Sequence, residues 1–404
     1  MARIAFHAAG YWGDVTPYVP IANELVTRGH DVVYALPRGL HALMADESFT
    51  VTDSGNPFAP DVVADDPEHT RLVERNGVRF GGALAGRYFT RTWLVPYASE
   101  NVDALRALAP DLFVTHATSA ATTRVAAESL RVPMVTGHLF PMILDTLARV
   151  PRPLWRVPGL ATGDRELNAV RREHGLEPIV FNSASAALHD GMLLLWPAAF
   201  ASSPRWPVVA QHTGFTQWRG PCGARLDPRV DAYLDDGDPV VVVTFGSSSA
   251  MVARLLFETF AVRLDDLGVR ALFLVGNLAN VTPSMRERPD VVAFAPLPDV
   301  LPRARAVVHS GSFGTTAAAL TAGVPSIGVP LLIDQLWNAR RIETLELGRV
   351  VNGRRRRTER VWAALDDVLT DDRYAARADA FARALPHDGV TAAADAIEAR
   401  LAGA

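Results

Sequence analysis

Residues 309–335, HSGSFGTTAAALTAGVPSIGVPLLIDQ, join a strand end, a glycine-rich turn and a helix start. An apolar run ends at His309, and a short Ala-rich helical segment follows Thr315. The exposed N–H groups and the positive dipole end of a helix after such a turn suit an anionic group such as a phosphate. The stretch therefore predicts a phosphate-binding strand, turn and helix.

Length and composition limit the class of protein. A chain of 404 residues is too long for one ordinary core, so two or three domains are expected. The formal net charge of −4 gives no support for a nucleic-acid or anionic-membrane partner. The single cysteine, Cys222, excludes an internal disulfide framework and a multi-cysteine metal site. With no apolar run of membrane-span length and a strand-like N-terminus, we expect a cytoplasmic protein without stable membrane insertion.

Strand and helix patterns alternate along both halves of the chain. In the first half, RIAFHA, DVVYALP, DLFVTHA and PMVTGHLF are typical of strands, and Thr16 with Pro17 predicts a helix start. In the second half, PVVVVTFG is apolar throughout, as a strand covered on both faces is. The alternation predicts α/β architecture with doubly wound parallel sheets.

The pattern changes character between the two halves. Trp, Pro, Gly and Gln cluster before residue 237 with little periodicity, which is typical of a linker. We therefore predict a first Rossmann-like domain over 1–205, a linker over 206–237, and a second Rossmann-like domain over 238–385. A terminal helix over 386–404 is expected to pack back on the first domain.

Five motifs in this order resemble the family 1 glycosyltransferases of the GT-B fold, particularly bacterial enzymes that attach sugars to natural products. The motifs are GYWGDVTP, TRGHDVVYALP, PDLFVTHA, AFAPLPDVLPRARAVVHSG and, most specifically, HSGSFGTTAAALTAGVPSIGVPLLIDQLWN. The resemblance covers essentially the whole chain. It implies two Rossmann-like domains facing across a cleft, with an acceptor bound by the first and a nucleotide-sugar by the second.

The resemblance assigns the donor site residue by residue. His309 matches a histidine that bonds the donor diphosphate, where a hydrogen-bond donor stabilises the charge that develops as the glycosidic bond breaks. Phe294 and Ala295 match the residues that hold the nucleotide base, although Phe294 in the core is an equal alternative. Asp334 and Gln335 match the pair that bonds the sugar hydroxyls, and Asp334 also fits a helix N-cap. The remaining diphosphate-binding candidates are Gly246, Ser247, Ser312, Phe313, Gly314 and Thr315.

One departure from the family pattern bears on the donor. Relatives that use UDP-sugars commonly carry a glutamate for the ribose hydroxyls early in the helix after the turn, but Ala317 to Leu320 hold no acidic residue. A buried acceptor exists to pair with a donor group, and a deoxyribose lacks the 2′-hydroxyl. We therefore expect a dTDP-linked deoxysugar, with a UDP-sugar as the alternative.

The catalytic base is less clear from the sequence. Many relatives use a histidine where Trp12 stands here, paired with an aspartate where His116 stands. The loop GYWGDVTP instead resembles a branch in which the aspartate is the base, which indicates Asp14. Asp14 and His116 are thus both candidates for catalysis, and Trp12 is a candidate for the acceptor pocket.

These residues predict an inverting transfer to a small-molecule acceptor, aromatic or macrocyclic. The reaction needs no resident cofactor and no metal, because the turn and the helix dipole carry the phosphate charge. The Asp-Gln pair argues against a nucleotide-sugar epimerase, and the missing first-strand G-x-G-x-x-G argues against a dehydrogenase. A non-catalytic nucleotide-binding helper of the same fold stays open, as does a homodimer.

Overall fold

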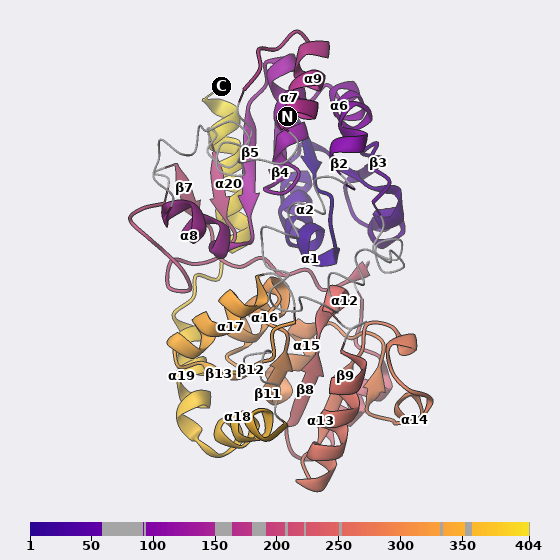
Figure 1. The fold of residues 1–404 in the computed structure, drawn as a ribbon, viewed down its shortest axis with the longest axis vertical. Coiled ribbons are helices and arrows are strands. Elements are labelled where there is room, and N and C mark those ends of the chain that lie inside the picture. Colours follow the sequence, from indigo (N-terminus) through magenta and orange to yellow (C-terminus); the bar gives the residue numbers. More distant parts are fainter. Residues whose placement is uncertain are drawn as a thin grey trace. The chain divides into compact units, whose positions relative to one another are not determined.

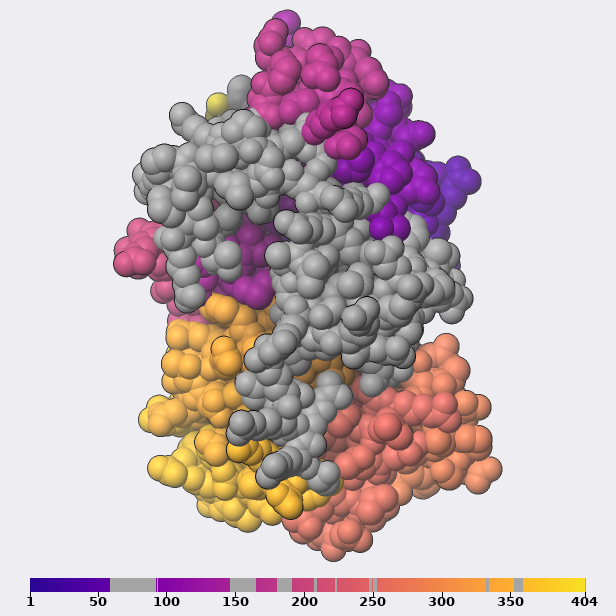
Figure 2. Space-filling view, viewed as in Figure 1, coloured from indigo at the N-terminus to yellow at the C-terminus, as the bar shows by residue number. Residues whose placement is uncertain are grey.

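A computed structural model describes most of the chain. The described residues are 1–58, 92, 94–149, 164–179, 191–206, 209–221, 224–249, 253–331, 334–351 and 358–403, drawn in colour in Figure 1 and Figure 2. They divide into two compact units, one formed by residues before position 222 together with those from Pro386 onward, the other by described residues between 224 and Leu385. No helix among the described residues is long and apolar enough to cross a membrane.

The first unit contains a parallel sheet of seven strands in the order β3-β2-β1-β4-β5-β6-β7. Its strands are β1 (Arg3–His7), β2 (Asp31–Leu36), β3 (Thr50–Asp53), β4 (Leu112–His116), β5 (Met134–His138), β6 (Met192–Leu194) and β7 (Ala210–His212). Its α-helices are α1 (Trp12–Val15), α2 (Val19–Thr27), α6 (Ala98–Ala107), α7 (Ala120–Leu130), α8 (Pro141–Arg149), α9 (Asp164–Glu173) and α20 (Gly389–Ala402). Short 3-10 helices occupy Thr16–Tyr18, Arg38–Met44 and Val95–Tyr97.

Apolar strand residues and helix faces build the core of this unit. Ala5 and Phe113 pack in one buried cluster with Val102 of α6, Val125 of α7 and Val170 of α9. Strands β4 and β5 are buried along their whole length, as expected of a parallel sheet covered on both faces. The side chains at the strand ends are consequently held in fixed places.

The C-terminal helix α20 packs against α2 within the first unit. Arg28, just after α2, contacts Asp395 at 2.6 Å and Glu398 at 2.7 Å, and His30 Nε2 lies 2.9 Å from the same Glu398 carboxylate. Buried Ala393, Ala394 and Ile397 supply the apolar face of α20. Ion pairs and apolar contacts together attach the last helix to the first unit.

The second unit contains a parallel sheet of six strands in the order β10-β9-β8-β11-β12-β13. Its strands are β8 (Val240–Thr244), β9 (Ala271–Leu274), β10 (Val291–Val292), β11 (Ala304–His309), β12 (Ser326–Gly328) and β13 (Gly348–Val350). Its α-helices are α11 (Pro228–Asp235), α12 (Gly246–Ser249), α13 (Arg254–Asp266), α14 (Pro283–Arg286), α15 (Leu297–Val300), α16 (Phe313–Ala322), α17 (Gln335–Thr344), α18 (Thr358–Thr370) and α19 (Asp372–Arg383). Short 3-10 helices occupy Leu278–Asn280 and Leu301–Arg303.

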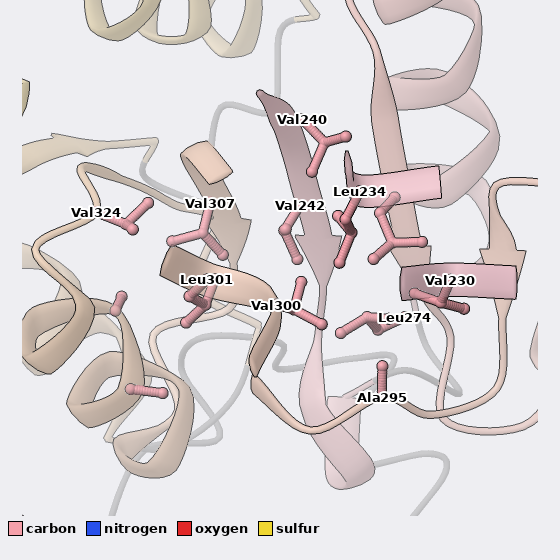
Figure 3. Packing of buried hydrophobic residues seen from close by; sticks show 13 residues of the cluster. Val230, Leu234, Val240, Val242, Leu274, Ala295, Val300, Leu301, Val307 and Val324 are labelled. Carbon is pink, nitrogen blue, oxygen red and sulfur yellow. The ribbon is translucent and has the colours of Figure 1, made fainter. Parts of the chain in front are cut away.

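A buried apolar cluster covers one face of the second sheet. Val240 and Val242 of β8 point into it together with Val307 of β11, and Leu234 of α11 and Val300 of α15 close it (Figure 3). The apolar run PVVVV is thus a central strand, as its sequence predicts. The two parallel α/β sheets confirm the predicted fold class.

Two local expectations differ from the structure. Thr16 was expected to cap the helix after β1, but α1 already occupies Trp12–Val15 and Thr16 belongs to the 3-10 turn that follows it. The stretch 206–237 was expected to be a linker, yet it holds β7 of the first sheet and α11 of the second unit. Sequence periodicity missed α1 and β7 because elements of four and three residues are too short to show a repeat. We propose that the linker lies between β7 and α11.

Candidate functional site

The carboxyl ends of β8, β11 and β12 meet at one edge of the second sheet. Thr244 pairs with His309, and His309 pairs with Gly328. The strand order turns between β8 and β11, because β9 continues on one side and β12 on the other. Ligands of open parallel sheets bind outside such a switch point. His309 therefore stands at the place where this unit is expected to bind its ligand.

His309 is completely buried, and its ring is oriented by the turn that follows. Its Nδ1 accepts the N–H of Gly311 at 3.1 Å, so the ring proton lies on Nε2. Burial lowers the pKa of His309 to about 4, which keeps the imidazole neutral at physiological pH. Nε2 has no hydrogen-bond partner among the described residues. The ring thus offers one N–H donor at the end of β11.

The N-terminus of α16 follows this donor directly. Ser312 is the N-cap residue, but its hydroxyl donates to Thr315 Oγ1 at 3.1 Å and caps no backbone N–H of the helix. Gly314 is exposed, and a Cβ there would meet no atom within 4 Å. Phe313 and Thr315 are buried beside it. The first turn of α16 is therefore exposed at Gly314 and receives no capping bond from the Ser312 side chain.

The loop after β8 lies against this turn. Gly246, the first residue of α12, has φ +68°, and a Cβ on it would lie 3.4 Å from Ser312 Oγ. Ser247 follows in the same short helix, and its side chain lies outside the described residues. The structure thus brings Gly246, from the loop after β8, next to Ser312, from the turn that follows His309.

The two base-site candidates differ in exposure. Phe294 is 47% exposed, which is unusual for so large an apolar side chain, whereas Ala295 is buried in the apolar cluster with Val300. The sequence left Phe294 open between core and ligand stacking. Its exposure removes the core alternative.

Asp334 and Gln335 open α17 and are both nearly buried. Burial raises the pKa of Asp334 to about 6, and its Oδ2 accepts from Asn338 Nδ2 at 2.9 Å. Gln335 uses both ends of its amide within the protein: Oε1 accepts from the Leu331 N–H, and Nε2 donates to Ser249 Oγ at 2.7 Å. Asp334 is the N-cap of α17 without a side-chain capping bond.

In the first unit, Asp14 lies in the turn that follows β1. Its Oδ2 accepts the Tyr11 N–H at 2.8 Å, so the carboxylate closes α1 as a capping box. A Cβ on Gly10 would lie 2.3 Å from this oxygen, so only glycine leaves room for the carboxylate. Trp12, in the same helix, is half-buried. The local fold thus holds the Asp14 carboxylate over the loop that follows β1.

His116 ends β4 and is completely buried. Its Nδ1 lies 2.6 Å from Thr118 Oγ1, and its Nε2 has no partner among the described residues. Burial, with smaller contributions from His138 and His7, lowers its pKa to about 3. His7 is also buried, between Thr123 Oγ1 at 2.7 Å and Asn101 Nδ2 at 3.2 Å. Three neutral histidines therefore mark the ends of β1, β4 and β5.

Tyr18 links the Asp14 turn to these strand ends, and the sequence gave no reason to select it. Its ring meets the His116 ring edge-on at 5.9 Å between centroids. A Cβ on Gly137 would lie 2.4 Å from a Tyr18 ring carbon, so the ring rests directly on the backbone of β5. Burial raises the pKa of Tyr18, with smaller contributions from Tyr34 and from the charge of Asp14. No sequence periodicity marks such a contact, because it joins residues about 120 positions apart.

Most of residues 61–92 and 140–167 in the first half of the chain lie outside the described residues. Within the described part of the chain, no group of three or more His, Cys, Asp or Glu side chains is arranged to hold a metal ion.

Comparisons with known proteins agree on one family. Residues 273–390 match the model described as Erythromycin biosynthesis protein CIII-like, C-terminal domain. The O-mycaminosyltylonolide 6-deoxyallosyltransferase of Streptomyces fradiae is 31% identical over 401 residues, which cover 93% of this chain and 92% of that protein.

Solved structures share the fold over the whole chain. The glycosyltransferase VinC, solved in complex with dTDP, aligns with a TM-score of 0.73 at 21% identity and covers 100% of both chains. The spinosyn rhamnosyltransferase SpnG, complexed with thymidine diphosphate, aligns with a TM-score of 0.66 at 19% identity over 96% of this chain and 98% of that one.

Proposed function

Because this chain belongs to the antibiotic-biosynthesis glycosyltransferases of the GT-B fold, we propose that it transfers a deoxysugar from a dTDP-sugar to a small-molecule natural product with inversion at the anomeric carbon. The observation that carries the proposal is the donor N–H of His309 at the end of β11, directly before the N-terminus of α16. Neutral imidazole and helix dipole together suit a diphosphate leaving group.

The deoxythymidine preference is supported by the chemistry of α16. Ala317, Ala318, Ala319 and Leu320 are all buried and supply no acceptor for a ribose hydroxyl. The relatives VinC and SpnG were solved with thymidine diphosphate. Phe294, with its exposed ring, is the proposed stacking partner of the base.

We assign the base to Asp14 rather than to His116. A histidine whose pKa lies near 3 binds a proton less well than an ordinary carboxylate, and its complete burial keeps an acceptor hydroxyl away. Asp14 is half-buried and held by the Tyr11 N–H. In the proposed reaction Asp14 takes the proton of the acceptor hydroxyl, the oxygen attacks the anomeric carbon, and dTDP leaves toward His309. Trp12 is the proposed wall of the acceptor pocket.

Equilibrium binding of dTDP and UDP to the purified protein tests the donor assignment. We expect dTDP to bind more tightly than UDP, with affinity reduced in His309→Ala and little changed in Asp334→Ala. A clear preference for UDP would contradict the deoxyribose argument. Failure to bind either nucleotide would contradict the proposed function.

A further inference from the structure

One buried amide connects the turn proposed for the diphosphate with the carboxylate proposed for the sugar. Asn338 lies on α17 and is completely buried. Its Nδ2 donates to the carbonyl oxygen of Gly311 and to Oδ2 of Asp334, each at 2.9 Å. Both partners are acceptors, so the orientation of the amide is determined. The side chain thus links residues 23 positions apart in the chain.

Around this amide, the turn at Gly311 and the helix α17 are packed in close contact. A Cβ on Gly311 would lie 2.5 Å from the Gln335 carbonyl oxygen, and one on Gly328 would lie 2.7 Å from the Ala339 Cβ. Gly311 has φ +85°, a conformation that favours glycine. The first turn of α17 therefore rests on the backbone at the ends of β11 and β12.

The same amide favours the charged form of Asp334. Burial raises the pKa of this carboxyl, and a backbone hydrogen bond and the side-chain bond from Asn338 both oppose that rise. No charged side chain contributes to the shift among the described residues. The neighbouring Gln335 amide is already bonded to Leu331 and Ser249. Asn338 is therefore the side chain that keeps the Asp334 carboxylate ionised and oriented.

We propose that Asn338 is a positioning residue that couples diphosphate recognition at the Gly311 turn to sugar recognition at Asp334. The inference rests on the proposed function, since it takes the two ends of the amide to serve two parts of one nucleotide-sugar. Asn338 touches neither part itself. It holds the sugar-binding carboxylate in register with the turn and in its charged form.

The test uses Asn338→Leu, which keeps a similar volume and removes the amide. Affinities for dTDP and for dTDP-glucose are measured by calorimetry on the whole protein. A hydrogen bond to a charged group supports an effect of about 10- to 100-fold on dTDP-glucose. The change for dTDP is expected to stay within about 3-fold. Asn168→Leu is the matched control, because Asn168 also bonds the backbone twice, to Ile179, but lies in the first unit.

A second readout needs no ligand. Carboxyl ¹³C NMR of aspartate-labelled protein follows the titration of Asp334, with Asp334→Asn identifying its signal. Asn338→Leu is expected to raise the pKa of Asp334 further above about 6. Asn338→Ser, whose hydroxyl can donate to one acceptor, is expected to fall between the two and serves if the leucine variant does not fold.

The outcomes separate the inference from the proposed function. If the wild-type protein binds neither dTDP nor dTDP-glucose, the proposed function fails and the coupling fails with it. If the wild type binds both, but Asn338→Leu weakens both equally or neither, the inference alone is overturned. An unchanged Asp334 titration in Asn338→Leu also overturns it.

Discussion

The central strands of the two units end on the same residue type and lead to different turns. β4 ends at His116 opposite Gly137, and β11 ends at His309 opposite Gly328. The eight residues that start at each histidine are HATSAATT and HSGSFGTT, which share His, Ser and both Thr at the same positions. The first unit therefore contains a near copy of the turn proposed to bind the diphosphate.

The two turns differ at the third position of these stretches, which is Thr118 in the first unit and Gly311 in the second. Gly311 has φ +85°, whereas Thr118 is not among the residues with positive φ. In the first unit Thr118 Oγ1 lies 2.6 Å from His116 Nδ1, and Ser119 Oγ accepts the Ala9 N–H at 2.9 Å. Neither helix is capped by its own N-cap side chain, Ser119 for α7 and Ser312 for α16. Thr118 thus contacts the His116 ring with its side chain, whereas Gly311 bonds the His309 ring through its backbone N–H.

The largest expected effect contrasts the acidic residues of the two units. Asp14→Asn should lower turnover by about 10²- to 10⁴-fold, because it removes the proposed general base. Its dTDP affinity should stay at the wild-type value. Initial rates with dTDP-glucose and an acceptor found in a panel of macrocyclic and aromatic aglycones measure this. Asp334→Asn is the matched variant, expected to weaken dTDP-glucose binding. Full activity in Asp14→Asn would contradict Asp14 as the general base and leave His116 as the candidate.

Alanine at Gly311, in the turn after β11, and at Gly137, within β5, tests how tightly each position is packed. Gly311→Ala should lower the free energy of unfolding of the second unit by about 3 kcal/mol, since a positive φ and a backbone contact both oppose the new methyl. Gly137→Ala meets the Tyr18 side chain instead, which can shift, and should cost about 1–3 kcal/mol. Urea unfolding measures both. A neutral Gly311→Ala would show that the turn is not constrained.

Acid should affect the first unit before the second. Burial lowers the pKa of His7 and His116 to about 3 and of His138 and His309 to about 4. Below about pH 6.5 the unfolded chain binds more protons at these sites, so stability falls by about 1.4 kcal/mol per pH unit for each histidine.

The second unit carries an opposing group. The pKa of Asp334 is raised to about 6, so the folded unit binds more protons there and acidification through that pH stabilises it. Of the four histidines that are buried in the described part of the chain, three belong to the first unit. Hydrogen exchange at pH 7.5 and 5.5, corrected for intrinsic rates, should show faster opening of β1, β4 and β5. His138→Leu should reduce this difference by about the destabilisation that one buried histidine contributes. Equal opening of both units would contradict the assignment.

The smallest expected effect concerns the two histidines themselves. His309→Ala should weaken dTDP binding by about 10-fold, the value of one hydrogen bond to a charged group. His116→Ala should leave dTDP affinity unchanged, because its ring lies in the unit that does not hold the proposed donor site. Calorimetry on both variants decides this. Equal losses would mean that the near copy of the turn also contributes to nucleotide binding.

Much of the fold could be predicted from local patterns. Five short apolar strands, the turn at 309–316 and the break before α20 all appear as local signals of the chain. Strand β7 and helix α1 did not, because elements of three or four residues show no period. The candidate donor residues were found through motif matching, and that local information was sufficient to place His309 and Ser312 on one turn.

The sequence by itself determined the α/β class, the glycosyltransferase family and the turn on which the donor proposal rests, because these depend on residues close together in the chain. Only the tertiary structure decided the tautomer of His309, the complete burial of His116 and the bonds of Asn338. Each of these depends on pairing register and helix packing. Pairing and packing set which polar groups lose water, and that loss determines which nitrogen holds a proton and which carboxylate stays charged.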